Sequence, residues 1–139
     1  MTESFVKLND GWNAQPNAPE PQVLFSEDAL LLTFDLNAFQ YPTFKEGQRA
    51  TLRFTNCSRF RLGAPNDEGW YAEYYGDNTR APWGDFYELS DPSIGNFDSD
   101  WRVGPAPSAP QPQRHFLFHL RDDTFECHAA DWSIAFHTK

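Results

Sequence analysis

The chain has 139 residues and a formal net charge of −9 at pH 7, and this length fits one domain with one hydrophobic core. So acidic a chain lacks the basic surface that non-specific binding to nucleic acid or to an anionic membrane needs, and a cationic partner suits it better. Its first residues show no basic stretch followed by an apolar one, and no long apolar run follows, so we expect a cytoplasmic protein that is neither exported nor embedded in a membrane.

Composition also predicts the class of secondary structure. The chain contains 13 Phe, 5 Trp and 5 Tyr, and aromatic residues favour strands. Its 11 Pro and 8 Gly interrupt every window in which a helical apolar stripe could develop. We therefore expect an all-β fold with little helix.

The N-terminal part predicts a lead-in followed by a strand pair. Residues 1–22 are rich in proline toward their end and show no apolar period, so we expect an extended lead-in, held down by Trp12. A short strand with Val23 and Phe25 then reaches a turn at residues 27–28. Over residues 30–36 apolar and polar residues alternate strictly, which is the clearest strand signal in the chain.

Residues 50–63 predict one strand with an interruption. Apolar residues alternate on both sides of Asn56-Cys57-Ser58, and we expect a bulge there that turns Cys57 inward. The arginines at 53, 59 and 61 should then face solvent. Because the chain is expected in a reducing compartment, Cys57 and Cys127 should be buried free thiols rather than a disulfide.

The rest of the chain predicts four more strands. Two are the aromatic segments 70–75 and 83–89, followed by a long proline-rich connection over residues 91–113. The last two strands, 115–122 and 124–139, form a hairpin in which Leu120 would pair with Phe125. About seven strands in all indicate an antiparallel β-sandwich or a partly open barrel, in a single domain over residues 1–139.

The terminal hairpin carries the sharpest chemical hypothesis. In the expected register His119 lies opposite Glu126, and a neighbouring carboxylate favours the imidazolium and orients the ring. His119 would then be the general base of a small hydrolase or isomerase, with a raised pKa, and Arg121 or Arg114 would hold an anionic substrate. The simpler interpretation, which we prefer, is a solvated strand face with a His–Glu pair.

A metal site on the same face is weaker. His115 and His119 lie four residues apart on one strand, about 13 Å at strand rise, so they cannot share an ion. Only His119 and His128, with Glu126 beside them, could share one, and we expect no zinc binding. Gly-rich phosphate loops and the common catalytic motifs are absent from the chain, so we expect no cofactor.

The second constellation is an acidic, aromatic-rich segment, residues 62–101. It holds nine acidic residues and only one basic residue, Arg80. Rigid aromatic rings among carboxylates are suited to anchoring a basic partner protein. The expected binding residues lie between 66 and 101 and are Trp70, Tyr71, Tyr74, Trp83, Tyr87, Asp67, Glu68 and Asp85.

Three functions remain open. The first is a non-enzymatic binding protein for a basic protein partner, a profile that immunity or antitoxin-type inhibitors share as a class although no motif links them to this chain. The second is the histidine-based hydrolase or isomerase. The third is a carbohydrate-binding module that stacks sugar rings on the same tryptophans and tyrosines. The bland alternative to all of them is that these rings form a second core layer.

Overall fold

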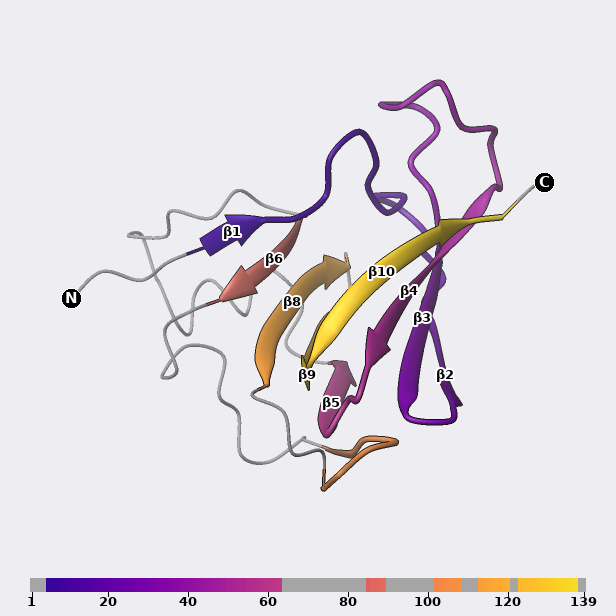
Figure 1. Ribbon diagram of the computed structural model, residues 1–139. Coiled ribbons are helices and arrows are strands. Elements are labelled where there is room, and N and C mark those ends of the chain that lie inside the picture. The colour runs from indigo at the N-terminus through magenta and orange to yellow at the C-terminus, as the bar shows by residue number, and fades with distance from the viewer. Residues whose placement is uncertain (1–4, 64–84, 90–101, 109–112, 121–122, 138–139) are drawn as a thin grey trace.

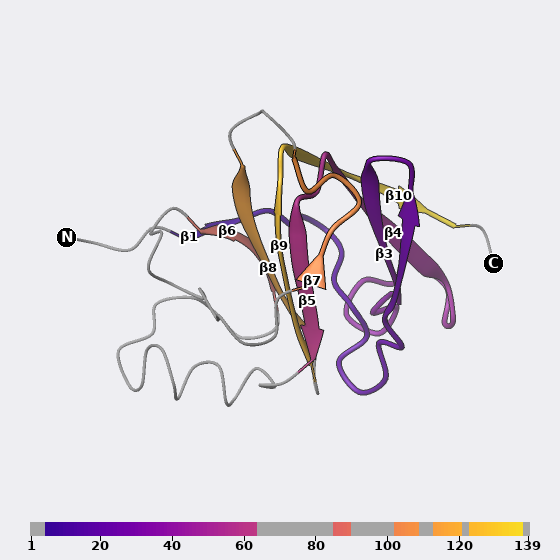
Figure 2. The same ribbon diagram turned by 90° about the horizontal axis from the view of Figure 1, so that it is seen from below.

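The computed structural model of the chain describes residues 5–63, 85–89, 102–108, 113–120 and 123–137 (Figure 1). These residues form ten strands and no helix. All strand pairs are antiparallel, and the strands make two sheets that pack against each other as separate layers (Figure 2). The predicted all-β sandwich is confirmed, and the sheets do not close into a barrel.

One sheet has six strands and the other has four. The six-stranded sheet contains, in spatial order, β1 (Phe5–Lys7), β6 (Phe86–Leu89), β8 (Arg114–Leu120), β9 (Asp123–Ala129), β5 (Arg59–Gly63) and β7 (Arg102–Val103). The four-stranded sheet contains β10 (Asp131–Phe136), β4 (Arg49–Thr55), β3 (Ala29–Asp35) and β2 (Gln22–Ser26). The outer strands β1 and β7 lie inside the predicted lead-in and the predicted proline-rich connection, and they are too short to show an alternation.

The chain changes sheet where the sequence predicted only a bulge. β4 ends at Thr55, Asn56 takes a positive φ of 50°, and β5 begins at Arg59 in the other sheet. The bulge prediction is therefore wrong. Its consequence for Cys57 is right, because this residue is fully buried. The alternation continues across the break because both strands bury the same side against a common core.

The last predicted strand also divides between the two sheets. β9 ends at Ala129 and β10 begins at Asp131. The two crossings lie side by side, since the Ala130 N–H donates to the Thr55 carbonyl at 2.9 Å and the Ser58 N–H donates to the His128 carbonyl at 2.9 Å. This corner joins the two layers of the sandwich.

Aromatic rings fill the space between the sheets. The ring centroid of Phe54 in β4 lies 5.3 Å from those of Phe116 and Phe125 in the opposite sheet. Trp12, which is 4% exposed, stacks on Phe34 at 5.9 Å, so the predicted anchoring of the N-terminal segment by this ring holds. Burial of several such rings is a large share of the hydrophobic stabilisation.

Both cysteines are free and fully buried, as the sequence predicted. Burial raises the pKa of the Cys127 thiol well above its usual value, and the adjacent Cys57 thiol raises it further. Because the thiolate is the reactive form, the Cys127 thiol acts as a small apolar side chain in the native fold.

Candidate functional site

Strands β8 and β9 pair in a register that is shifted by two residues from the predicted one. Leu120 pairs with Asp123 rather than Phe125, and His119 pairs with Thr124 rather than Glu126. Glu126 lies opposite Leu117. The general-base hypothesis for His119 therefore loses its orienting carboxylate.

Glu126 instead joins a buried polar cluster on the outer face of the six-stranded sheet. Its Oε2 lies 2.7 Å from the Nε2 of His115, and its Oε1 lies 3.7 Å from the Nη1 of Arg61. The side chains of Arg61 and Glu126 are 1% and 0% exposed, and that of His115 is 10% exposed. His128 is directly opposite His115, with ring centroids 4.8 Å apart. We call Arg61, His115, Glu126 and His128 the outer-face cluster.

The expectation that this face is solvated is wrong. Leu117, His119 and Thr124 on the same face are all at most 2% exposed. Arg61 was expected in solvent together with residues 53 and 59. Of these three only Arg53 is exposed, and Arg59 is half-buried.

Burial lowers the pKa of all three histidines on this face. Desolvation is the main cause at each, and it lowers the pKa of His115 to about 4 and those of His119 and His128 to about 3. The positive charge of Arg59 contributes at His115 and His128. The rings are therefore neutral at pH 7. The predicted rise in the pKa of His119 is wrong.

Of the two arginines expected to hold an anionic substrate, the structure describes Arg114. Arg114 forms a two-fold hydrogen bond with the Glu88 carboxylate at 2.7 and 2.9 Å, and its Nη1 lies 2.9 Å from Asp131. The hydrogen bond to Glu88 is the main cause that raises its pKa. Arg114 is thus committed to two carboxylates within the fold, and Arg121 lies outside the described residues. Among the described residues, His119, Glu126 and Arg114 are therefore not brought together as one site.

The metal candidates are also far apart. His128 pairs with His115, and His119 lies four residues further along β8, about 13 Å at strand rise. Within the described part of the chain no group of three or more His, Cys, Asp or Glu side chains is placed to hold a metal ion.

Of the expected binding residues, two fall in the described part of the chain. Tyr87 is 1% exposed, in β6 of the six-stranded sheet, so it offers no surface to a partner. The Asp85 side chain is 14% exposed. The other six expected binding residues, which are Trp70, Tyr71, Tyr74, Trp83, Asp67 and Glu68, lie outside the described residues.

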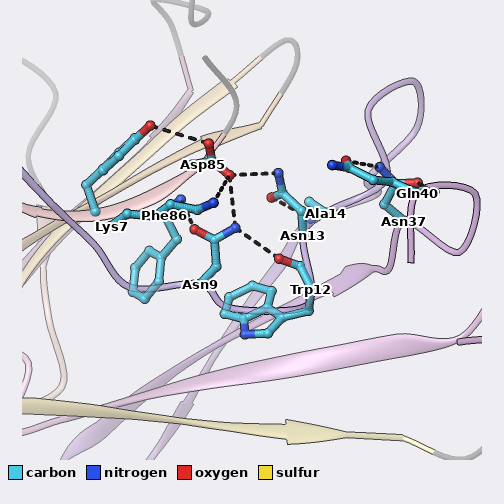
Figure 3. Close-up of polar contacts among 10 residues, drawn as sticks. Lys7, Asn9, Trp12, Asn13, Ala14, Asn37, Gln40, Asp85 and Phe86 are labelled. Atoms are coloured by element: carbon cyan, nitrogen blue, oxygen red, sulfur yellow. Dashed lines mark hydrogen bonds and ion pairs between the residues drawn. The ribbon is translucent and has the colours of Figure 1, made fainter. Parts of the chain in front are cut away.

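Asp85 is a structural node that the sequence did not predict (Figure 3). Its Oδ1 accepts from the Nδ2 of Asn9 at 3.0 Å and from the Nδ2 of Asn13 at 3.2 Å. Asn9 also donates to the Trp12 carbonyl at 2.9 Å and accepts from the Phe86 N–H at 3.2 Å. These bonds fasten the N-terminal segment to β6. The signal in the sequence was two asparagines flanking a tryptophan, but nothing in it pointed to a carboxylate more than 70 residues away.

Two surface hollows lie among the described residues. The larger, about 770 Å³, lies among the loops at one end of the four-stranded sheet and includes Phe39, which is 99% exposed. The smaller, about 460 Å³, lies between β2 and the edge strands of the six-stranded sheet. Neither hollow contains a residue of the outer-face cluster.

Comparison with known proteins assigns no family. No family model, no curated protein and no solved structure matches the chain. The described residues contain no helix of the length and apolarity that a membrane span requires.

Proposed function

We propose that the chain is a non-enzymatic binding protein that presents residues 66–101 of its acidic, aromatic-rich segment, residues 62–101, to a basic protein partner. The observation that carries the proposal is the distribution of charge. This segment has a net charge of −8, from nine acidic residues against Arg80. The other 99 residues hold eleven acidic and ten basic residues, so they sum to −1.

The sandwich satisfies much of its own charge, which supports the proposal. Asp35 pairs with Arg49, and Glu126 pairs with Arg61. Two acidic residues of the segment, Asp85 and Glu88, are likewise engaged inside the fold. The seven others, with Arg80, keep a net charge of −6. A field of one sign steers an oppositely charged partner and raises its association rate.

Aromatic residues of the same segment would supply the anchors. Trp70, Tyr71, Tyr74 and Trp83 stand among these acidic residues in the sequence, and Trp and Tyr are the side chains that most often dominate binding energy at protein interfaces. A small acidic inhibitor of the immunity or antitoxin type is the form of binding protein that this combination fits best.

The test compares two triple variants with the same change in charge. In the first, Asp67→Asn, Glu68→Gln and Glu73→Gln remove three charges from the segment. In the second, Asp10→Asn, Glu46→Gln and Asp123→Asn remove three from the sandwich. The partner is first captured from native lysate at low ionic strength with the wild-type chain, and its affinity for each purified variant is then measured by calorimetry.

We expect the segment variant to bind about tenfold more weakly or worse, with a shallower salt dependence, and the sandwich variant to stay within about twofold. Trp70→Ala and Trp83→Ala should each weaken binding by about tenfold or more if these rings are anchors. Equal losses in the two triple variants would show only bulk charge attraction. That result, or the capture of nothing at low ionic strength, contradicts the proposal.

A further inference from the structure

β2 is one of the two outer strands of the four-stranded sheet, and β10 is the other (Figure 1). Phe25 pairs with the buried Leu30 and so points toward the opposite sheet, yet it is 53% exposed. The opposite sheet ends there in β7, which has two residues. The hollow of about 460 Å³ lies in this gap and is lined by Val23, Leu24, Phe25, Phe60, Leu62 and Arg102.

Some backbone N–H and C=O groups of β2 point away from the sheet. The Asp35 N–H donates to the Pro19 carbonyl, whereas the Leu36 N–H donates to the Gln48 carbonyl on the side of β4. Hydrogen bonding alternates along an antiparallel strand, so Leu31 of β3 bonds toward β2, to its pair Leu24. The backbone groups of Val23 and Phe25 therefore point away from β3, toward the open edge.

β2 lacks the features that usually guard an edge strand. Natural outer strands are short, or carry Lys, Pro or a bulge that blocks pairing with another chain. β1 and β7 have three and two residues, whereas β2 has five, QVLFS, with none of those residues. Leu24 on its other face is 65% exposed. An unguarded edge with exposed apolar side chains is suited to strand addition, in which an incoming segment extends the sheet.

The charges around β2 indicate which kind of strand can pair with its free edge. Exposed carboxylates stand at both ends of the strand, Glu20 before it and Glu27 and Asp28 after it. A second copy added antiparallel about Leu24 would bring Asp28 opposite Glu20 of that copy, and like charges in this position are unfavourable. Arg102 in the hollow disfavours a basic side chain in the middle of the added strand.

We propose that the β2 edge binds an extended segment of a partner protein in which alternating apolar residues are flanked at both ends by lysine or arginine. The apolar side chains enter the hollow beside Phe25, and the backbone of the segment pairs with Val23 and Phe25. The terminal cations lie near Glu20 and near Glu27 and Asp28. Apart from Leu62, the residues that line this surface lie outside residues 62–101 in the sequence, and the proposal does not depend on the function proposed for that segment.

The probe is a fluorescent nine-residue peptide with two lysines at each end and alternating Val and Thr between them. Two matched peptides replace the lysines with glutamates or methylate alternate backbone nitrogens. Binding is measured by fluorescence polarisation against the full chain. We expect the lysine peptide to bind, the glutamate peptide to bind at least about tenfold more weakly, and methylation on the pairing side to abolish binding.

Two variants locate the binding. Val23→Pro removes an outward N–H without taking a donor from the β2–β3 ladder, and prolines are tolerated in this way on edge strands. Glu27→Gln with Asp28→Asn removes two flanking charges. Each should weaken the peptide about tenfold, whereas Asp10→Asn and the segment triple variant at 67, 68 and 73 should not change it. Circular dichroism and the unfolding midpoint confirm that each variant is folded.

Four results overturn the proposal. They are no binding of the lysine peptide by the wild-type chain, equal binding of the lysine and glutamate peptides, unchanged binding by folded Val23→Pro, and a wild-type dimer that Val23→Pro dissociates in analytical ultracentrifugation. The last result would assign the edge to a second copy. Loss of peptide binding in the segment triple variant alone would transfer the site to residues 62–101, so the two proposals fail separately.

Discussion

The two sheets of the sandwich share an aromatic core but differ on their outer faces. On the four-stranded sheet the outward residues of β4 are exposed or half-buried, as at Arg53 and Thr51. On the six-stranded sheet most outward residues of β8 and β9 are almost completely buried, as at His119 and Glu126, and His115 and His128 are partly buried. The same alternation of apolar and polar residues therefore accompanies a solvent-exposed outer face in one sheet and a largely buried polar outer face in the other. An alternating pattern identifies the inner side of a strand but not the surroundings of its other side.

The largest effect should come from the outer-face cluster. Glu126→Ala leaves Arg61 buried without this carboxylate, and breaking a buried pair in this way costs about 3–5 kcal/mol. Urea unfolding measures the loss. Arg53→Ala on the outer face of the four-stranded sheet should change stability by less than about 0.5 kcal/mol. Similar small losses in both variants would mean that the two outer faces do not differ.

A smaller effect is expected at Asp85, which fastens the N-terminal segment to the six-stranded sheet. Asp85→Ala removes one acceptor shared by the Asn9 and Asn13 amides, and loss of a partner of partly buried donors costs about 1–3 kcal/mol. Hydrogen exchange should show faster exchange at the Phe86 N–H, which depends on the position of Asn9. An unchanged exchange rate at the Phe86 N–H would mean that Asp85 does not anchor the N-terminal segment.

The histidines make stability depend on pH. Their folded pKa values, about 4 for His115 and about 3 for His119 and His128, lie below the unfolded value of about 6.5. The unfolded chain therefore binds more protons between these values, and stability is full above pH 6.5 and falls as the pH drops toward 3. Each ring contributes at most about 1.4 kcal/mol per pH unit.

A matched substitution isolates this contribution from that of the carboxylates. His119→Gln should reduce the slope of unfolding free energy against pH between 4 and 6, because it removes one ring whose pKa is lowered by burial. Parallel slopes for wild type and His119→Gln would show that this ring is already accessible to protons in the native fold.

A small effect is expected from a pair of hydroxyls on the outer face of the four-stranded sheet. The hydroxyls of Thr33 and Thr51 lie 2.8 Å apart across β3 and β4. Thr33→Val removes this bond but keeps a β-branched side chain suited to the strand, so we expect a loss of about 0.5–1 kcal/mol. A loss of 3 kcal/mol or more in the free energy of unfolding, measured with urea, would mean that this face is as dependent on its polar contacts as the buried outer face of the six-stranded sheet.

The β8–β9 hairpin shows which features could be predicted from the sequence and which could not. The predicted register of β8 and β9 was two residues away from the observed one, and a shift of two keeps every side chain on its face. Burial of Phe116 and Phe118 was therefore predicted correctly, while the cross-strand partner of Glu126 was not. The sequence selected the right glutamate and the wrong histidine.

The remaining differences have equally local causes. The alternation of residues 50–63 does not reveal the change of sheet at Asn56, because both sheets bury the same side of the strand. β1 and β7 are too short to produce a period. The Asp85 node depends on two asparagines from the far end of the chain, and such pairings leave no local pattern. The burial of the outer-face cluster could not be predicted because an alternating strand looks the same whether its polar side faces water or protein.

The non-catalytic interpretation depends on the three histidines of the six-stranded sheet being sealed and neutral. An NMR titration of the ring Cε1–H resonances, assigned with His115→Gln, His119→Gln and His128→Gln, measures this directly. We expect none of the three rings to titrate between pH 8 and pH 5. A ring with a pKa of 6.5 or higher would contradict the non-catalytic interpretation and would again make this face a candidate catalytic site.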